Sequence, residues 1–252
     1  MFLASKLTTP VATMPEIRLN KFLAERLGLS RREADDAIMA GKVTIDGEKA
    51  TLGARLSTPE NDTKSRQDID KLPKVCYNGK IVPFQTEFLY LAMNKPVGYV
   101  CSRRAQGSAP TLYELLPPKY QKLKTVGRLD KDSSGLILLT NDGDFAFQMT
   151  HPKFHKEKIY EVILDRPLEP LHQQMISDYG VILDDGPSRF TVIRSDAGID
   201  PQYTVVLSEG RNRQIRRTFA ALGYKVITLH RTQFGKFQLS GLKPGEFVEF
   251  QP

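Results

Sequence analysis

From Phe88 onward the chain is dominated by short, alternating apolar segments that are not separated by a regular series of helices. A parallel sheet needs a long crossover, usually a helix, between consecutive strands. Because that alternation is missing, the pattern predicts an α+β fold built mainly on antiparallel strands. The expected strands are 89–93, 97–102, 136–140, 159–164, 189–193, 203–207 and 247–250, and the expected helices are 111–116, 144–149, 170–179 and 213–222.

The segment before this region has a different pattern, typical of two helices followed by a hairpin. Apolar residues recur at helical spacing up to Gly28, which is expected to end a first helix. Ser30 and Glu33 have the spacing of a capping box and predict the start of a second helix. Residues 42–48 then alternate and run into an Asp-Gly turn. We therefore expect a small helix-helix-hairpin domain over 16–63.

The remaining segments are expected to connect or precede these domains. Residues 1–15 contain one lysine, no acid and no apolar run long enough for a secretory signal, so we expect a disordered tail. A transit peptide and a true start at Met14 are the alternatives. The polar and charged segment 64–85 predicts a linker with a short hairpin around Asn78-Gly79, and 86–252 is then the main domain.

Composition excludes several classes of protein. Two cysteines, Cys76 and Cys101, cannot build a disulfide framework or a zinc site alone, and we expect them to be reduced thiols of a cytoplasmic protein. Apolar runs such as 135–139 are far shorter than the roughly 20 residues of a membrane-spanning helix. We therefore expect no membrane partner, and a monomer.

Positive charge is concentrated near the end of the chain. The formal net charge is +7, and the segment from Ser208 to Lys236 contains seven cationic residues against the single acid Glu209. Without an apolar anchoring helix, this concentration favours nucleic acid over a membrane surface as the anionic partner. A solvated basic face is the alternative interpretation.

Residues 127–143 combine a polar loop with an apolar strand, an arrangement that often carries catalytic groups. Four residues match the first half of an EF-hand calcium loop, namely Asp130, Asp132, Ser134 and Gly135. The twelfth position is Asn141 instead of glutamate, which argues against calcium. The chain also lacks the Gly-x-x-x-x-Gly-Lys-Ser/Thr phosphate loop and a His-Glu-x-x-His zinc helix.

The same stretch resembles the catalytic motif of bacterial ribosomal-RNA pseudouridine synthases that carry an N-terminal alpha-L RNA-binding domain. It contains Gly127-Arg-Leu-Asp130 followed by Ser134-Gly-Leu-Ile-Leu-Leu-Thr-Asn-Asp-Gly143. Further segments match in family order, at 94–98, 157–160, 209–217 and 229–245, and the alpha-L domain is matched at 18–23, 30–34 and 41–47. The resemblance covers about 17–250. It departs from the family at Thr218-Phe219 and at 58–72, which bears on substrate choice.

The resemblance implies that Asp130 is the nucleophile that converts uridine to pseudouridine, by attack on either the ribose or the uracil ring. This isomerisation is redox-neutral and hydrolyses no phosphate, so neither a cofactor nor a metal is expected. The family pattern places Tyr160 against the target base. It also implies that Arg128 fills the space of the extruded nucleotide, whose removal from the stack costs a few kcal/mol.

An ionised nucleophile in a dry pocket needs a cation nearby. On a helix over 213–222, at about 100° per residue, Arg213 and Arg217 point away from the apolar face and Arg216 lies at its boundary. We therefore predict that Arg216 pairs with Asp130, as the family pattern also implies, and that Arg213 and Arg217 contact RNA phosphates. A surface salt bridge elsewhere is the alternative for Arg216.

Further RNA contacts are expected from Arg211 and from Arg31 and Arg32. The latter two occupy the first turn of a predicted helix, where a phosphate would offset their unfavourable interaction with the helix dipole. The expected partner is ribosomal RNA or a precursor ribosomal subunit; the motifs lean towards the large subunit, although relatives also modify small-subunit rRNA and tRNA. The competing hypotheses are a non-catalytic RNA-binding or ribosome-assembly protein and a metal-dependent nuclease using Asp130 and Asp132.

Overall fold

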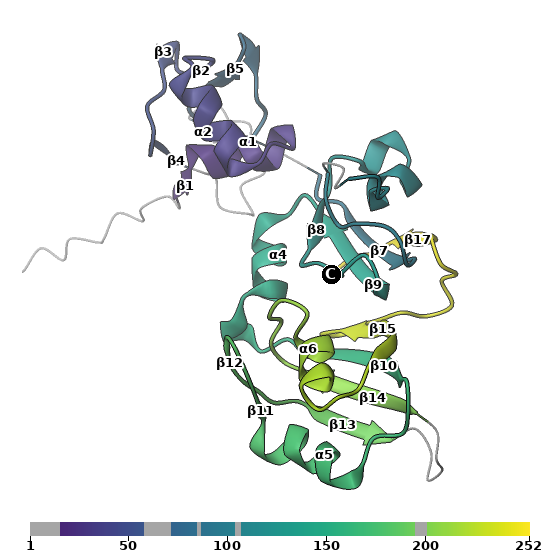
Figure 1. Cartoon of the computed structure of the whole chain (residues 1–252). Helices are drawn as coiled ribbons and strands as arrows, with labels where there is room; N and C mark the ends of the chain where they lie inside the picture. Colours follow the sequence, from purple (N-terminus) through teal and green to yellow (C-terminus); the bar gives the residue numbers. More distant parts are fainter. Residues whose placement is uncertain (1–15, 58–71, 85–86, 104–106, 195–200) are drawn as a thin grey trace, which may run out of the picture. The chain divides into compact units, whose positions relative to one another are not determined.

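The computed structural model describes residues 16–57, 72–84, 87–103, 107–194 and 201–252, so the expected tail at 1–15 lies outside the described residues. The chain divides into two units, Met1–Glu87 and Phe88–Pro252 (Figure 1). Within the described ranges, no helix is both long enough and apolar enough to span a membrane.

The first unit has the predicted order of helix, helix and hairpin. Helix α1 (Leu19–Leu27) ends at Gly28, whose φ of 72° is left-handed. Helix α2 (Arg31–Met39) begins with the expected capping box, in which Ser30 and Glu33 exchange hydrogen bonds. The strands form one pair, β1 (Glu16–Arg18) with β4 (Arg55–Ser57), and a sheet of β3 (Glu48–Lys49), β2 (Val43–Ile45), β5 (Val75–Tyr77) and β6 (Lys80–Ile81).

The second part of the expected linker belongs to this first unit. Strand β5 pairs antiparallel with β2, and Val75 and Val82 are buried in the same apolar core as Leu19 and Phe22. The structure therefore corrects the predicted linker over 64–85, because its polar surroundings concealed two core valines. Residues 58–71 of that range lie outside the described residues.

The second unit is built on a nine-stranded, mainly antiparallel sheet, as predicted. Its strands follow the order β13-β14-β10-β15-β9-β7-β17, with β8 beside β9 and β16 beside β15. Their bounds are β7 (Tyr90–Lys95), β8 (Lys124–Val126), β9 (Ser134–Thr140), β10 (Lys158–Leu164), β13 (Thr191–Arg194), β14 (Gln202–Leu207), β15 (Val226–Phe234), β16 (Phe237–Gln238) and β17 (Phe247–Glu249).

Shorter elements cover or connect the sheet. Helix α6 (Gln214–Ala221) packs Ile215 and Phe219 into the main core beside residues of β10 and β14. The hairpin of β11 (Val181–Leu183) and β12 (Gly186–Ser188) contacts α6. The others are α4 (Gly143–Thr150), α5 (Pro170–Gln174), the π-helix η4 (Met175–Tyr179), and the 3-10 helices η1 (Leu112–Leu115), η2 (Pro118–Tyr120) and η3 (Pro152–Phe154).

Two differences from the predicted strands matter for the site. The nine-residue strand β15 is central in the sheet but was not predicted, because polar residues interrupt its apolar pattern. Residues 229–232, the start of the last matched family segment, lie within this strand. Conversely, the expected strand at 97–102 contributes only a bridge between Val100 and Thr111.

Strands β9 and β15 join the two halves of the sheet through a short parallel pairing. Only two residue pairs are in register, Ser134 with His230 and Gly135 with Arg231. Gly135 has a φ of +105°, and a Cβ there would lie 2.2 Å from the Arg231 carbonyl oxygen. The close approach therefore requires glycine. Figure 1 shows β7, β8, β9 and β17 in one half and β10, β13, β14 and β15 in the other.

The chain returns to the first half of the sheet at its end. Strand β17 pairs antiparallel with β7. The buried residue Asn94 of β7 holds the returning segment, because its backbone N–H donates to the Glu246 carbonyl at 3.0 Å and its Nδ2 donates to the Leu242 carbonyl at 2.8 Å. The first half of the sheet therefore contains strands from both ends of the second unit, with β17 paired to β7.

Candidate active site

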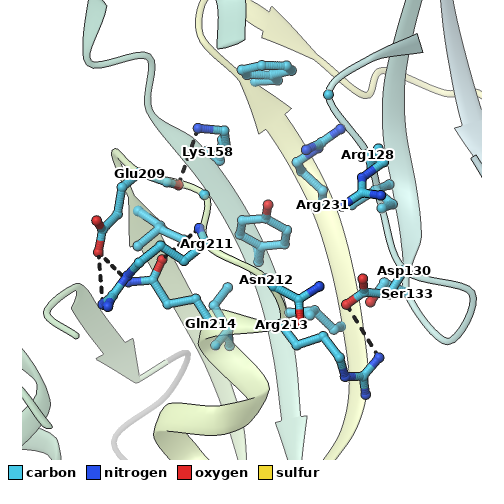
Figure 2. A pocket seen from close by; sticks show the side chains of 18 of the residues that line it. Arg128, Asp130, Ser133, Lys158, Glu209, Arg211, Asn212, Arg213, Gln214 and Arg231 are labelled. Atoms are coloured by element: carbon cyan, nitrogen blue, oxygen red, sulfur yellow. Dashed lines mark hydrogen bonds and ion pairs between the residues drawn. The ribbon is translucent and has the colours of Figure 1, made fainter. Parts of the chain in front are cut away.

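A cavity of about 310 Å³ lies at the junction of the two half-sheets. Its walls come from the loop before β9, from β10 and β15, and from the segment that leads into α6. The volume is near the lower end of the range found for small-molecule sites. Of the described residues in its walls, five are cationic and two are acidic. The cavity therefore favours a small ligand that carries negative charge (Figure 2).

Asp130 lies on the loop between β8 and β9, which the fully buried Lys95 holds in place. Lys95 Nζ donates to the Ser133 carbonyl at 2.6 Å and to the Pro96 carbonyl at 3.0 Å. Burial lowers the pKa of Lys95, against smaller opposing effects of Cys101, Asp130 and Asp132. The Ser133 N–H donates to the Asp130 carbonyl at 3.1 Å, which tightens the turn. The Asp130 side chain remains 33% exposed at the cavity wall.

Arg213, not Arg216, is the cation that reaches the Asp130 carboxylate. Arg213 Nη1 lies 3.5 Å from Asp130 Oδ2 (Figure 2). The same guanidinium donates to both oxygens of Asp132, at 2.9 Å and 2.8 Å. These hydrogen bonds hold the pKa of Asp132 below its ordinary value, with the charge of Arg216 adding to the effect. One guanidinium therefore connects the two aspartates.

The predicted pairing of Arg216 with Asp130 is corrected by the position of the helix terminus. Helix α6 begins at Gln214, and Arg213 precedes it with a left-handed φ of 46°, so a helical wheel does not describe its direction. Arg216 binds the neighbouring residue instead, with its Nε 3.3 Å from Asp132 Oδ2 and its Nη2 donating to the Asp132 carbonyl at 2.8 Å. Arg216 is not part of the cavity wall.

The arginines predicted to be available for phosphates are also engaged. Arg217 forms ion pairs with Asp184 and Asp185, in the turn between β11 and β12. Arg211 pairs with Asp185 at 2.9 Å and donates to the carbonyl of Pro187 at 2.7 Å. In this structure both side chains therefore fasten α6 and its preceding loop to the hairpin, although Arg211 also lines the cavity.

The other predicted residues fall into two groups. Tyr160, on β10, is 7% exposed and lines the cavity together with Asp130 and the exposed Arg128. Arg31 and Arg32 are exposed in the first turn of α2, in the other unit. The structure thus gathers Asp130, Tyr160, Arg128, Arg211 and Arg213 around one cavity, and places Arg216 behind it.

Two further cavity residues were not singled out in the sequence. Lys158 precedes Tyr160 by two positions on β10, and residues i and i+2 of a strand share a face, so the alternation could have indicated it. Burial, and then the nearby charge of Arg231, lower the pKa of Lys158 to about 8. Arg231, on β15, is only 2% exposed and lies within a matched motif.

The arrangement suits a carboxylate nucleophile better than a metal centre. The described residues contain no group of three or more His, Cys, Asp or Glu side chains that could hold a metal ion. The two aspartates of the loop instead share the guanidinium of Arg213, which lies 3.5 Å from Asp130 and 2.8 Å from Asp132.

Comparisons with known proteins agree with this geometry. Residues 89–221 match the profile of the family described as RNA pseudouridylate synthase, and residues 17–63 match the S4 domain. Ribosomal small subunit pseudouridine synthase A of Yersinia pestis is 39% identical, over 92% of this chain and 93% of that protein. The enzyme of the same name from Pasteurella multocida is 36% identical over 92% and 94%. A crystal structure described as a pseudouridylate synthase is 34% identical, has a TM-score of 0.63, and covers 93% of this chain and 96% of its own.

Proposed function

The chain belongs to the RNA pseudouridylate synthase family, with an N-terminal S4 domain, and from this premise we propose that it converts a uridine of ribosomal RNA to pseudouridine with Asp130 as the nucleophile. One observation carries the assignment of the nucleophile. The Asp130 carboxylate lies at the wall of a cavity that Tyr160 also lines, with the Arg213 guanidinium 3.5 Å away.

The reaction explains why a carboxylate, a tyrosine and a cation are needed together. In pseudouridine the ribose is attached to C5 of uracil instead of N1, so the bond from C1′ to N1 must break and a bond from C1′ to C5 must form. Attack by Asp130, on the sugar or on the ring, holds one fragment while the other turns. The bond to Asp130 must then break again, the proton on C5 must leave, and N1 must gain a proton. Tyr160 lines the cavity, and we assign its hydroxyl to this proton transfer.

Arg213 and Asp132 prepare Asp130 for this role. Arg213 supplies positive charge beside the nucleophile, and Asp132 fixes the guanidinium through two parallel hydrogen bonds. Arg216 in turn holds the Asp132 carbonyl and carboxylate. Hydrogen bonds from Lys95 on one side and from Arg213 and Arg216 on the other thus hold the loop of the nucleophile in the absence of RNA.

Small-subunit rRNA is the substrate we propose. The relatives named above are small-subunit enzymes, so the sequence-based leaning towards the large subunit is not supported. We propose that the S4 domain binds structured rRNA, in free or precursor-subunit form, with Arg31 and Arg32 contacting phosphates and Arg128 entering the space of the extruded uridine. The enzyme would then act as a cytoplasmic monomer.

The proposal is tested with Asp130→Asn, which is nearly isosteric but a poor nucleophile. Purified mutant protein should form no pseudouridine in small-subunit rRNA, whereas its affinity for that RNA should stay within about threefold of the wild type. Asp178→Asn is the matched control, since Asp178 is exposed and is not a cavity residue. Product formation by Asp130→Asn at about a tenth of the wild-type rate would exclude Asp130 as the nucleophile.

Mapping in cells identifies the RNA. Carbodiimide adducts stop reverse transcription at pseudouridine, so small-subunit rRNA from a deletion strain should lose one stop that the wild-type gene restores. A protein that binds rRNA without forming pseudouridine would support the non-catalytic alternative. Chelator-sensitive cleavage of the RNA would support the nuclease.

A further inference from the structure

The cavity has a second cationic region beyond the one at Asp130. Arg128, Lys158 and Arg231 all line it, and no described carboxylate lies within 4.0 Å of any of their charged groups. The two acids of the wall are already compensated, because Asp130 faces Arg213 and Glu209 faces Arg211. Figure 2 shows Lys158, Arg128 and Arg231 towards one end of the cavity and Asp130 with Arg213 towards the other.

Arg231 has a buried guanidinium N–H donor without a hydrogen-bond partner among the described residues. Its side chain is 2% exposed, its Nε donates to the Leu136 carbonyl at 2.7 Å, and its guanidinium lies 4.9 Å from the Phe234 ring centre. Its Nη2 is buried and has no hydrogen-bond partner among the residues that the structure describes. A buried, charged donor left without an acceptor is costly, so an acceptor is expected from a ligand.

Lys158 faces the same part of the cavity with weak partners. Its Nζ lies 3.3 Å from the carbonyls of Lys156 and Glu209, at the long limit of hydrogen bonding, and 5.3 Å from the Phe234 ring centre. Burial and the charge of Arg231 both lower the pKa of Lys158, to about 8, so near neutral pH it is still mostly protonated. Lys158 and Arg231 thus both lie near the Phe234 ring, and the charge of Glu209 only partly opposes the lowering of the Lys158 pKa.

We propose that Lys158 and Arg231 form an anion subsite, which holds a phosphate group of the RNA strand next to the target nucleotide. This inference rests on the proposed function, since it takes the nucleotide at Asp130 to be part of RNA. A phosphate has several oxygen acceptors, which can serve both Nη2 of Arg231, which has no partner among the described residues, and Nζ of Lys158, which has only two carbonyls at 3.3 Å. Tyr160 lines the same cavity from β10, two positions after Lys158.

The subsite would fix the register of the strand. With one phosphate anchored by Lys158 and Arg231, the attached ribose and base can extend along the same cavity to Asp130. The anchor therefore orients the nucleotide without reading its base, which is the usual division between phosphate contacts and base contacts.

Binding of mononucleotides tests the subsite without requiring turnover. Uridine, uridine 5′-monophosphate and uridine 3′-monophosphate are titrated calorimetrically into the full-length wild type, Lys158→Gln and Lys225→Gln at pH 7. Lys225 is an exposed lysine at the start of the β15 region and is not a cavity residue, so it controls for loss of one positive charge.

At least one monophosphate should bind the wild type about tenfold more tightly than uridine, as expected for charge-assisted hydrogen bonds. The stronger of the two identifies the phosphate as the 5′ or the 3′ one. Lys158→Gln should lose most of this preference, whereas Lys225→Gln should keep it. Equal affinity of wild type for all three ligands, or an undiminished preference in Lys158→Gln, would overturn the subsite.

Arg231 provides a second variant with a known structural complication. Because its Nε also holds the Leu136 carbonyl, Arg231→Gln is interpreted only together with its urea unfolding curve, and Arg231→Lys keeps the charge. If the wild type prefers a monophosphate but forms no pseudouridine, the subsite stands and the proposed function fails. If the wild type forms pseudouridine and Lys158→Gln binds all three ligands like the wild type, the proposed function stands and the subsite fails.

Discussion

Replacing Gly135 by alanine should separate the two half-sheets and with them the halves of the active site. The added Cβ would lie 2.2 Å from the Arg231 carbonyl oxygen and 2.5 Å from its nitrogen, both backbone atoms that cannot rotate away. To reach an ordinary contact of 3.4 Å, β9 and β15 must move apart by about 1.2 Å, which breaks their hydrogen bonds. The left-handed φ of +105° adds strain of its own.

The expected loss of stability follows from these two effects. Backbone strain at a positive φ costs about 1–3 kcal/mol and an overpacked contact costs about 1–3 kcal/mol, so Gly135→Ala should lower the free energy of unfolding by roughly 2–6 kcal/mol. Displacement of Asp130 from Tyr160 and Arg213 by about 1 Å should lower the single-turnover rate by about a hundredfold.

Urea unfolding and single-turnover pseudouridine formation measure the two effects. Gly245→Ala is the matched control, because Gly245 has a similar φ of +89° but no atom within 4 Å of the place that an added Cβ would take, so it isolates the strain. A stability of Gly135→Ala within about 1 kcal/mol of the control, with a rate within about threefold of wild type, would refute the view that the junction holds the site together.

Three further predictions concern single charges and the first unit. Arg213→Gln should lower the single-turnover rate about tenfold or more at saturating RNA, because the cation beside Asp130 is lost. The control Arg217→Gln should keep a rate within about threefold of the wild type, and equal losses of rate in the two variants would contradict the role of Arg213. The pKa of Lys158 is about 8 in the folded protein and near 10.5 in the unfolded chain, with Arg231 and Glu209 acting on the folded value. Between these pH values the unfolded state binds more protons, so the free energy of unfolding should rise with pH. Urea titrations should show this rise for the wild type and not for Lys158→Gln. Removal of residues 1–87 should weaken rRNA binding in filter assays but leave the second unit folded by circular dichroism, because each unit has its own core; unchanged affinity would make the first unit structural.

The sequence predicted those helix ends and loops that are determined by residues close together in the chain. The Ser30–Glu33 capping box and the left-handed stop at Gly28 both form as expected, since each involves residues three positions apart or fewer. The loop that carries Asp130 was also predicted, because a polar stretch running into a buried strand is visible in the sequence.

The features that were missed depend on partners far away in the chain. The direction of Arg213 follows from one left-handed residue before α6, which a helical wheel cannot represent. Arg217 is held by acids of the β11–β12 turn, and no spacing rule indicates that contact. The same holds for β15, in which Arg231 lines the cavity, and for Val75, which is part of the core of the first unit.

The return of β17 to the edge of β7 has a consequence for the order in which the chain is made. Strand β7 is synthesised early in the second unit, but its outer edge is unpaired until residues 247–249 have emerged. An open edge exposes N–H and C=O groups that can pair with other chains. Asn94 then captures the carbonyls of Leu242 and Glu246 as they arrive. The half-sheet that carries the nucleophile is therefore the first part of this unit to be begun and the last to be completed.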